Sequence, residues 1–449
     1  MSSFPEDFQF ETCILIQLWI AEDFISAFGS SKSLEEVAED YLEDLISRNL
    51  IMSTNPTLPT PKHNVCRFNF QTQTHLVEDC CKQLPPTARS IYLFCGYIFS
   101  KRWSSVKLEV FSRFNLLRVL AIFHEGVSPP PFPLAITKLF HLTYLSIRCR
   151  DKLPASMAAL QNLQTLVMDG FNIILPGKIW MTKKLRHIHV GRYYTFPSRR
   201  RETIRNKHLP IDLPNLVELS RPYYSNCTNE VFSAIPNLKR LNVYVSCMRR
   251  KYRLDNHLID MSSLRKLEAL KCFSNDMYQH FYWQPLSMKR FVFPLSLKRL
   301  SFSKCRFPWE DISTLAMLPN LEELKLKYNA VLGEVWRLSD DDKFESLKLL
   351  LFSNIYLESW EICSDSYPNL KSLVLKRCEC LREIPTDFGE ICTLEAIELH
   401  ECSRAAEDSV KKIEQEQDMG NNFLKVYIRS SGSKFYISPE NSSILHNIN

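Results

Sequence analysis

One leucine-centred spacing recurs along most of the chain. The stretch NLEELKLKYN, which begins at Asn320 and ends at Asn329, spaces its leucines as L-x-x-L-x-L. A helix needs apolar residues three and four positions apart, whereas this stretch alternates leucine with lysine as a half-buried strand does. Further copies of the spacing would mark it as one unit of a repeating design.

Eleven other segments carry the same spacing. Their first leucines lie 21 to 33 residues apart, and most of these gaps fall in the range of roughly 20–29 residues that is typical of leucine-rich repeats. Two segments are weak, because Arg221 and Ala269 stand where the third apolar residue is expected. The twelve segments begin at Leu117, Leu142, Leu163, Leu185, Leu216, Leu238, Leu264, Leu297, Leu321, Leu347, Leu370 and Leu394.

This spacing predicts the fold class, an α/β leucine-rich-repeat solenoid in which about twelve repeats form a right-handed arc. Each unit contributes one strand to a shared parallel sheet, and its leucines stack on those of neighbouring units because no unit buries its apolar face alone. Apolar-proline segments such as KLPASMAAL, ILPGKIW and EIPTDFGEI predict short helical or 3₁₀ returns on the convex side. The tail from about Gly420 predicts a last strand that closes the sheet edge.

The residues between the leucines are predicted to face the concave side. Charged and aromatic side chains gather there, and this mixture suits the recognition of protein surfaces. The alternative is that most of these side chains are simply solvated. The candidate partner-binding residues on this side are Tyr144, Arg148, His187, His189, Arg240, Tyr244, Arg299, Lys325, Lys327 and Lys376.

Two basic segments extend the set of candidates. Residues 192–207 fill the gap of 31 residues between two repeats and carry Arg199, Arg200 and Arg201, and residues 247–253 form the second segment. The segments could be solvated insertions or a docking patch for an acidic protein surface. Because the two segments combine Arg, Lys and Tyr, single-stranded nucleic acid is a third alternative. We expect a protein partner and no nucleic acid.

Residues 1–88 lack the repeat and contain one clear helix. In SLEEVAEDYLEDLISRNL, Ser33 and Glu36 have the spacing of a capping box, and apolar residues recur at helical steps behind them. We expect the acidic residues on the other face to be solvated. The alternative is a docking edge for basic partners. These acidic residues are Glu35, Glu36, Glu39, Asp40, Glu43 and Asp44.

A family resemblance rests on several long motifs. The stretches FPED (4–7), LIQLWIAEDFI (15–25) and LEEVAEDYLEDLISRNLIM (34–52), together with the repeats, resemble plant NB-ARC leucine-rich-repeat disease resistance proteins. The resemblance covers nearly the whole chain and is greatest to the late blight resistance protein homologues of nightshade plants. It implies a winged-helix remnant over 1–88, a linker and cap of the array over 89–116, and the repeat domain over 117–449.

The departures from that family are specific. No G-x-x-x-x-G-K-[ST] phosphate loop is present, and the nucleotide-sensing Met-His-Asp motif is degenerate, with Phe68, Asn69 and Phe70 at its positions. Gln17 stands where the family has Arg. Asp23 stands where it has Gly, so we expect backbone strain there. ADP or ATP, which full-length family members bind, is therefore not expected to be a cofactor of this N-terminally truncated chain.

Composition narrows the remaining alternatives. Fifteen scattered cysteines, no secretory signal, and no apolar run of about 18–20 residues indicate a cytoplasmic protein without a membrane span. Peripheral association with a membrane is the alternative location. His187 and His189 face the same way on one strand but lack a third metal ligand, and we expect neither a metal site nor an enzyme.

The resemblance implies the function. Family members detect a pathogen effector, or a guarded host protein that an effector has modified, and trigger defence with local cell death. We expect this chain to be such an immune receptor or receptor fragment, acting alone or with a full-length resistance protein. The alternatives are an F-box-like substrate receptor of a ubiquitin ligase, and a decoy or pseudogene product.

Overall fold

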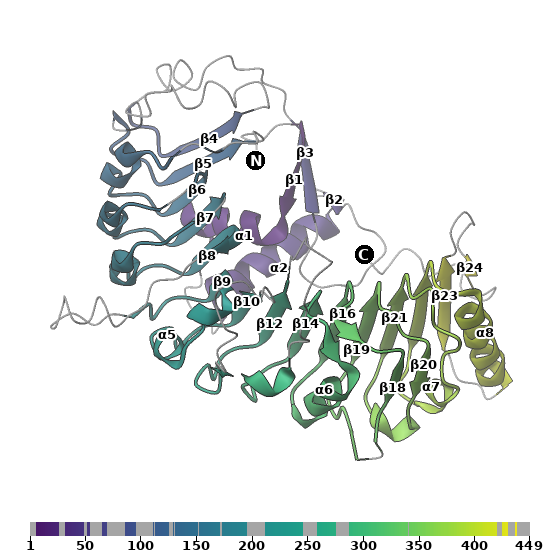
Figure 1. Cartoon of the computed structure of the whole chain (residues 1–449). Helices are drawn as coiled ribbons and strands as arrows, with labels where there is room; N and C mark the ends of the chain where they lie inside the picture. Colours follow the sequence, from purple (N-terminus) through teal and green to yellow (C-terminus); the bar gives the residue numbers. More distant parts are fainter. Residues whose placement is uncertain are drawn as a thin grey trace. The chain divides into compact units, whose positions relative to one another are not determined.

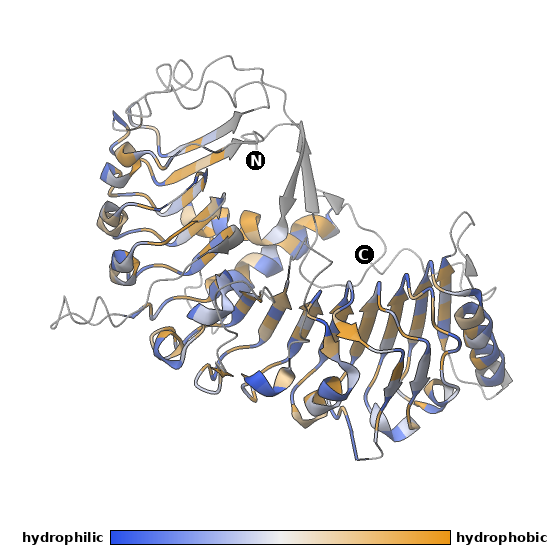
Figure 2. Cartoon of the chain, in the orientation of Figure 1, coloured by the Kyte–Doolittle hydropathy of each residue, from blue (hydrophilic) through white to orange (hydrophobic). Residues whose placement is uncertain are grey.

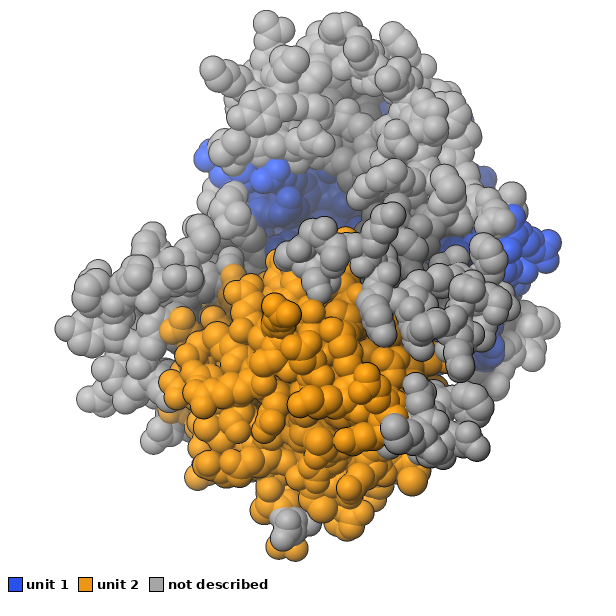
Figure 3. Space-filling model, turned by 90° about the vertical axis from the view of Figure 1, so that its right-hand side faces the viewer, with its two compact units in different colours: residues 1–221, 444–449 blue, residues 222–443 orange. Residues whose placement is uncertain are grey.

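The chain folds into two compact units, residues 1–221 and residues 222–443, which Figure 3 colours separately and which are described one at a time. The computed structural model describes residues 6–26, 32–48, 52–53, 65–69, 86–95, 111, 113–124, 129, 131–150, 152–170, 173–194, 212–245, 258–274, 287–339, 341–419, 424–429 and 436–437. Within these residues, no helix combines the length and apolar character needed to cross a bilayer.

The first unit opens with a small helix-and-sheet module. Its strands pair antiparallel in the order β1-β3-β2, and its two helices pack their apolar faces together through residues such as Ile16, Ile20 and Leu42. The elements are β1 (Glu6–Glu11), α1 (Thr12–Ala21), α2 (Leu34–Ser47), β2 (Met52–Ser53) and β3 (Val65–Asn69).

The start of α2 and the turn that follows α1 both agree with the sequence-based expectation. The Ser33 Oγ accepts a hydrogen bond from the Glu36 backbone N–H, and the Glu36 carboxylate accepts one from the Ser33 N–H, so the predicted capping box is confirmed. Just beyond α1, Asp23 has a φ of 60°, in the left-handed region that glycine tolerates best. The strain predicted at Asp23 is therefore confirmed. The Arg118 Nη2 lies 2.6 Å from Asp23 Oδ2.

The repeats of the first unit form a parallel sheet. Its strands keep one register, in which Leu120, Leu145, Leu166 and Ile188 lie side by side in the interior. β4, in the segment expected to be a linker and cap, pairs in parallel with β5, so the sheet begins before Leu117. The strands are β4 (Ser90–Cys95), β5 (Val119–His124), β6 (Tyr144–Arg148), β7 (Thr165–Asp169), β8 (His187–Tyr194) and β9 (Glu218–Tyr223), whose last residues enter the second unit.

The second unit continues the same design. The side chain of Leu324 is fully buried and aligns with Leu300 and Leu350 on the neighbouring strands. Figure 2 shows apolar and polar residues alternating along these strands, as the period of two requires. The sheet strands are β10 (Arg240–Tyr244), β12 (Ala269–Phe273), β14 (Arg299–Ser303), β16 (Glu323–Lys327), β19 (Leu349–Ser353), β21 (Ser372–Lys376), β22 (Ala396–His400), β23 (Lys425–Arg429) and β24 (Tyr436–Ile437).

One repeat has a different register from the one predicted. Leu270 aligns with Leu241 and Leu300, whereas Ala269 aligns with Arg240 at a concave position. The repeat therefore begins at Leu267, not Leu264, and Cys272 supplies its third apolar side chain. The prediction that Ala269 weakens this unit is wrong. Leu264 and Leu267 are both fully buried, so spacing alone could not choose between them.

The convex side carries short elements and stacked aromatic rings. The apolar-proline segments form single 3₁₀ turns at Ala155–Ala159 and Gly177–Met181, and a short helix at Asp387–Glu390, as predicted. Trp336 stacks between Trp309 and Trp360, with ring centroids 4.8 and 5.3 Å apart. The convex elements are α5 (Asn229–Ser233), β11 (Ile259–Asp260), β13 (Phe291–Val292), β15 (Phe307–Pro308), α6 (Trp309–Ser313), β17 (Val331–Leu332), β18 (Val335–Arg337), β20 (Ser359–Glu361) and α7 (Asp387–Glu390).

The C-terminal end of the array is closed by a helix and a strand pair. The predicted last strand is present as β23, and β24 adds to it in antiparallel orientation. Between β22 and β23, the sixteen-residue helix α8 (Arg404–Met419) contributes Val410 and Ile413 to the core. The sequence analysis did not predict this helix.

Candidate functional site

The concave side of the first unit is covered by the chain's own N-terminal helices, and we call this surface the covered face (Figure 1). Leu18 and Ala21 of α1 pack on Val119, Ala121 and Tyr144, which stand at concave positions of β5 and β6. Tyr144 is fully buried there. The prediction that Tyr144 lies on the concave side is confirmed, but helix α1 covers the position and it is not open to an outside partner.

Polar contacts surround this apolar patch. The Thr143 hydroxyl donates to the Ala21 carbonyl oxygen over 3.1 Å, at the last residue of α1. The Tyr92 hydroxyl donates to the Glu22 carboxylate over 3.0 Å, and Ser90 contacts the same carboxylate. The end of α1, which leaves backbone carbonyls without helical partners, is thereby tied to the first strands of the sheet.

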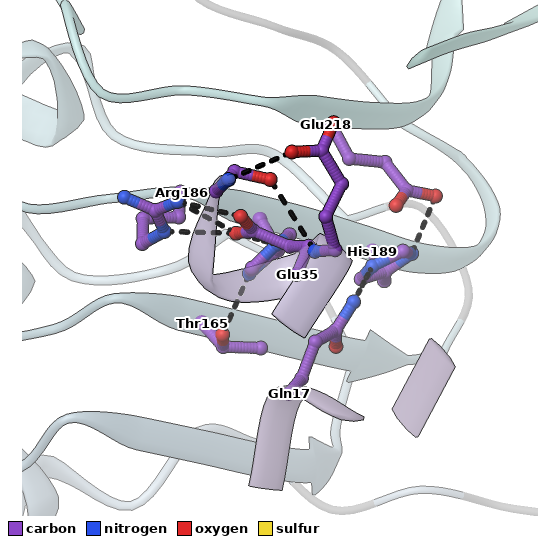
Figure 4. A network of polar contacts seen from close by, with 9 residues as sticks. Gln17, Glu35, Thr165, Arg186, His189 and Glu218 are labelled. Carbon is purple, nitrogen blue, oxygen red and sulfur yellow. Dashed lines mark hydrogen bonds and ion pairs between the residues drawn. The ribbon is translucent and has the colours of Figure 1, made fainter. Parts of the chain in front are cut away.

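A second, charged contact joins α2 to β8 (Figure 4). The Arg186 Nε and Nη2 donate to Glu35 Oε1 over 2.9 and 2.7 Å, and Nη2 also reaches Oε2 at 2.8 Å. The His187 Nε2 lies 3.2 Å from Glu35 Oε1, and its Nδ1 lies 3.1 Å from the Thr165 hydroxyl. Glu35 is 3% exposed and His187 1% exposed, so this contact is shielded from water and salt.

The setting of Glu35 favours its charged form. Burial alone would raise the pKa of the carboxyl, but His187 and the Arg186 guanidinium outweigh that effect and hold the pKa well below its usual value. Its place in the first turn of α2 adds the favourable end of the helix dipole. The expectation of a solvated acidic face holds for Glu43 and Asp44, which are exposed, and is wrong for Glu35.

Gln17 makes the third contact between the helices and the repeats. Its buried side-chain Nε2 lies 2.7 Å from His189 Nε2. With the amide donating, His189 Nε2 must accept, and the ring proton then lies on Nδ1, which is 3.1 Å from the Ser220 hydroxyl and 3.8 Å from Glu218. The position at which the resemblance implies Arg is thus occupied by a neutral side chain that contacts a histidine on the covered face.

The covered face joins the N-terminal helices to the repeats of the first unit. The rings of His187 and His189 lie 6.3 Å apart, and no group of three potential metal ligands occurs among the described residues. This interface was not expected from the sequence. Its signal was present in the apolar side chains at concave positions of the first repeats, Val119, Ala121 and Val167, where solvated repeats carry polar residues.

The concave side of the second unit has the opposite character, and we call it the basic face. It consists of the outward positions of β10, β12, β14, β16, β19, β21, β22 and β23. The strand register places them in three rows. Eight are Lys or Arg, namely Arg240, Lys271, Arg299, Lys325, Lys327, Lys376, Lys425 and Arg429, and two are Glu, namely Glu323 and Glu398.

Four lysines gather in the middle of the basic face. Burial, and then the nearby charges of Lys325, Lys271 and Lys376, lower the pKa of Lys327 from its ordinary value. Burial also lowers the pKa of Lys376. The Lys325 ammonium bonds Glu323 at 2.7 Å, whereas Lys327 and Lys376 have neither a hydrogen bond nor an ion pair with their side chains in the described part of the chain.

The other predicted residues fall in several places. Arg148 lies 3.4 Å from Asp169, and Arg299 lies 4.0 Å from Glu268. Tyr244 is buried with its ring edge-on to Tyr223 and Phe273, and is therefore not an exposed contact. Four other residues cannot be placed in this way: Arg199, Arg200, Arg201 and Phe70 lie outside the described residues.

Phe68 and Asn69, two of the three residues predicted to stand at a degenerate nucleotide-sensing motif, lie on the small antiparallel sheet. Phe68 and Asn69 end β3 and align with Phe8 and Glu6 of β1. Their side chains lie outside the described part of the structure. The prediction that this chain lacks the His-Asp pair therefore rests on the residue types alone.

Comparison with known proteins identifies the family. The family described as "Leucine-rich repeat region" matches residues 89–419, and "Disease resistance protein Winged helix domain" matches residues 4–67. The chain belongs to the leucine-rich-repeat proteins of the disease resistance type. The module of α1, α2 and β1–β3 is therefore the winged-helix region, and the two faces lie on the repeat region. Neither matched region is a nucleotide-binding domain.

The chain is similar to late blight resistance protein homologues over nearly its whole length. A late blight resistance protein homologue of Solanum demissum is 27% identical over 97% of this chain and 36% of its own length. Another from the same species is 29% identical over 98% of this chain and 61% of its own length. The chain thus spans about a third of the first relative. Among solved structures, a leucine-rich-repeat protein of Leptospira interrogans is 17% identical to this chain, with a TM-score of 0.37. The match covers 77% of this chain and 92% of the Leptospira chain.

Proposed function

We propose that this protein is a non-catalytic immune receptor, or receptor fragment, that recognises another protein through the basic face in plant defence. The observation that supports this most is a regular parallel sheet presenting partly exposed charged side chains, two of them lysines whose side chains make no hydrogen bond or ion pair in the described part. Charged and polar groups on a rigid surface are suited to steering and selecting a protein partner.

The two faces divide the candidate residues. Tyr144, His187 and His189 are engaged by α1 and α2, so they hold the winged-helix region in place. Arg240, Arg299, Lys325, Lys327 and Lys376 stand on the basic face and remain the candidates for contact with a partner. We keep Arg199, Arg200 and Arg201 as further candidates on their sequence alone.

The proposed partner is a pathogen effector or a host protein that an effector has modified, with a full-length resistance protein as a second partner. We propose that the protein acts without catalysis, without a nucleotide bound by the described repeats, without a nucleic acid partner and without a membrane span. A cytoplasmic location, with peripheral membrane association as the alternative, fits the free cysteines of the described residues.

The test is capture of partners by the full chain. Tagged protein expressed in leaf tissue is recovered with and without a panel of pathogen-secreted proteins, and local cell death is scored in the same tissue. We expect one secreted or host protein to be enriched and to change the cell-death response. Recovery of a Skp1-type adaptor in place of such a protein would contradict the proposal and support the ubiquitin-ligase alternative.

A further inference from the structure

The basic face carries a marked excess of positive charge. Its outward positions include eight Lys or Arg and only two Glu, and one of the two Glu is bonded to Lys325. The other, Glu398, lies 3.3 Å from His400. Such a surface attracts anions over several ångströms, because the charges of one sign act together.

The extent of the lysine cluster limits the kind of anion. Lys271 lies on β12 and Lys376 on β21, and β14, β16 and β19 stand between them. At about 4.8 Å per strand, four spacings give about 19 Å. This exceeds the size of a single phosphate group and corresponds to about six residues of extended polypeptide at about 3.3 Å each.

The centre of the face suits a polypeptide better than a nucleic acid. Leu349, on β19 between Lys325 and Lys376, is a partly exposed aliphatic side chain, whereas Leu351 and Val374 at neighbouring concave positions are 4% and 2% exposed. Single-strand binders instead place exposed aromatic rings between their cations so that bases stack on them. No concave position of β14, β16, β19 or β21 carries an aromatic residue, and the partly exposed rings of Phe273 on β12 and Tyr427 on β23 lie outside these four strands.

Lys327 and Lys376 are the groups that an anion would stabilise most. Both are partly buried, and neither has a hydrogen bond or ion pair through its side chain in the described part of the chain. A partly buried ammonium costs free energy unless a counter-charge offsets the cost, which Glu398 does in part for Lys376, whereas Lys327 is near the like charges of Lys325, Lys271 and Lys376. A carboxylate placed between them would remove that cost and form charge-assisted hydrogen bonds.

We infer that the basic face binds an acidic polypeptide segment of about six residues in extended form, across β12 to β21, with carboxylates at Lys327 and Lys376. This inference rests on the proposed function, since it names the chemistry of the partner recognised there. The partner would present glutamate or aspartate side chains interspersed with aliphatic ones.

Fluorescence anisotropy on the purified full chain tests the inference. The probe is a dye-labelled peptide, Glu-Val-Glu-Glu-Leu-Glu, and its matched control replaces every Glu by Gln. We expect the Glu peptide to bind at least tenfold more tightly than the Gln peptide, with an affinity that falls as salt is raised. Equal affinities of the two peptides would overturn the inference.

Two sets of variants localise the binding. Lys327→Glu with Lys376→Glu should weaken the Glu peptide at least tenfold, and Lys327→Gln with Lys376→Gln should weaken it by a smaller factor. The control, Lys266→Glu with Lys289→Glu, makes the same change of net charge at exposed positions outside the face. It should change the affinity less than twofold. A tenfold loss in the control would overturn the inference, because net charge alone would then explain binding.

Competition separates the alternative ligands from the proposed function. An unlabelled thymidine oligonucleotide or inositol hexaphosphate that displaces the peptide at lower concentration than the unlabelled peptide itself would overturn the inference in favour of that ligand class. A captured protein partner that binds the Lys327→Glu, Lys376→Glu variant unchanged would overturn the inference and leave the proposed function standing.

Discussion

The covered face and the basic face are built on the same repeat, but their concave residues differ in what they contact. Both lie on parallel strands whose leucines point into the array. In the first unit, the positions between the leucines are Val119, Ala121 and Tyr144, and the chain's own helix packs on them. In the second unit, the corresponding positions include eight Lys or Arg and two Glu. The leucines therefore build the sheet, and the residues between them decide what the sheet contacts.

The two faces also differ in how their side chains affect the stability of the folded chain. On the covered face, apolar burial and a shielded ion pair hold the winged-helix region to the repeats, and losing either leaves a cavity or an unpaired charge. On the basic face, partly buried lysines lie near one another, which disfavours their charged forms. The covered face stabilises the folded chain through its own contacts, whereas the basic face is stabilised most by a bound anion.

The largest expected contrast is between two tyrosines at concave positions. Tyr144→Ala removes a fully buried ring beneath α1 and should lower the free energy of unfolding by about 3–5 kcal/mol. Tyr427→Ala, at a partly exposed concave position of β23, should cost about 1 kcal/mol or less. Urea denaturation followed by circular dichroism measures both. Equal losses would contradict the distinction between the two faces.

The next contrast lies within one helix. Glu35→Ala leaves Arg186 and His187 without their carboxylate and should cost about 2–3 kcal/mol, somewhat less than for fully buried pairs because Arg186 is partly exposed. Glu43→Ala, an exposed position of the same helix, should change stability by about 0.5 kcal/mol at most. The two variants are compared in parallel denaturation experiments. A Glu43 effect as large as that of Glu35 would refute the role of the ion pair.

The same carboxylate predicts a pH dependence. The pKa of Glu35 is lowered in the folded chain, so the unfolded chain takes up its proton first, near the ordinary value of 4.5. The stabilisation by Glu35 is therefore fully present above about pH 4.5 and is lost as the pH falls toward the folded pKa. Unfolding free energies measured from pH 6 to pH 3 should fall more steeply for the wild type than for Glu35→Gln. Parallel slopes would show that Glu35 contributes nothing in this range.

The smallest effect concerns the turn after α1. Asp23→Gly and Asp23→Ala both remove the contact with Arg118, but only the glycine relieves the positive φ. The glycine variant should therefore be the more stable of the two by about 1 kcal/mol. Thermal denaturation of the pair gives the comparison. A more stable alanine variant would show that the left-handed conformation of residue 23 is not maintained in solution.

Local patterns predicted much of the fold. The L-x-x-L-x-L spacing located most strands, because each strand's inward side chains must meet those of its neighbours at a fixed period. The capping box at Ser33 and the strain at Asp23 were also predictable, since each depends on a few adjacent residues. The assignment failed at Leu264, where a second leucine three residues later fits the same spacing and only the pairing with Leu241 and Leu300 decides.

The candidate site was less predictable. Arg186 and Glu35 are 151 positions apart, and no local pattern shows that they meet. From the sequence, His187 and His189 were expected at the surface, because the helices α1 and α2 that cover them lie far away along the chain. The basic face was predictable in composition, since its lysines alternate with leucines. The contrast between Lys325, which is paired with Glu323, and Lys327, which has no ion pair within the described residues, depends on side-chain geometry.

The central claim is that the N-terminal helices cover the concave side of the first unit while concave residues of the second unit remain accessible. Hydroxyl-radical footprinting of the intact chain, read by mass spectrometry, tests it at Tyr144 and Tyr427, with the urea-unfolded chain as the reference for intrinsic reactivity. The account predicts that Tyr144 is oxidised at least tenfold more slowly than Tyr427 in the folded chain and equally fast after unfolding. Oxidation of Tyr144 as fast as that of Tyr427 in the folded chain would contradict it.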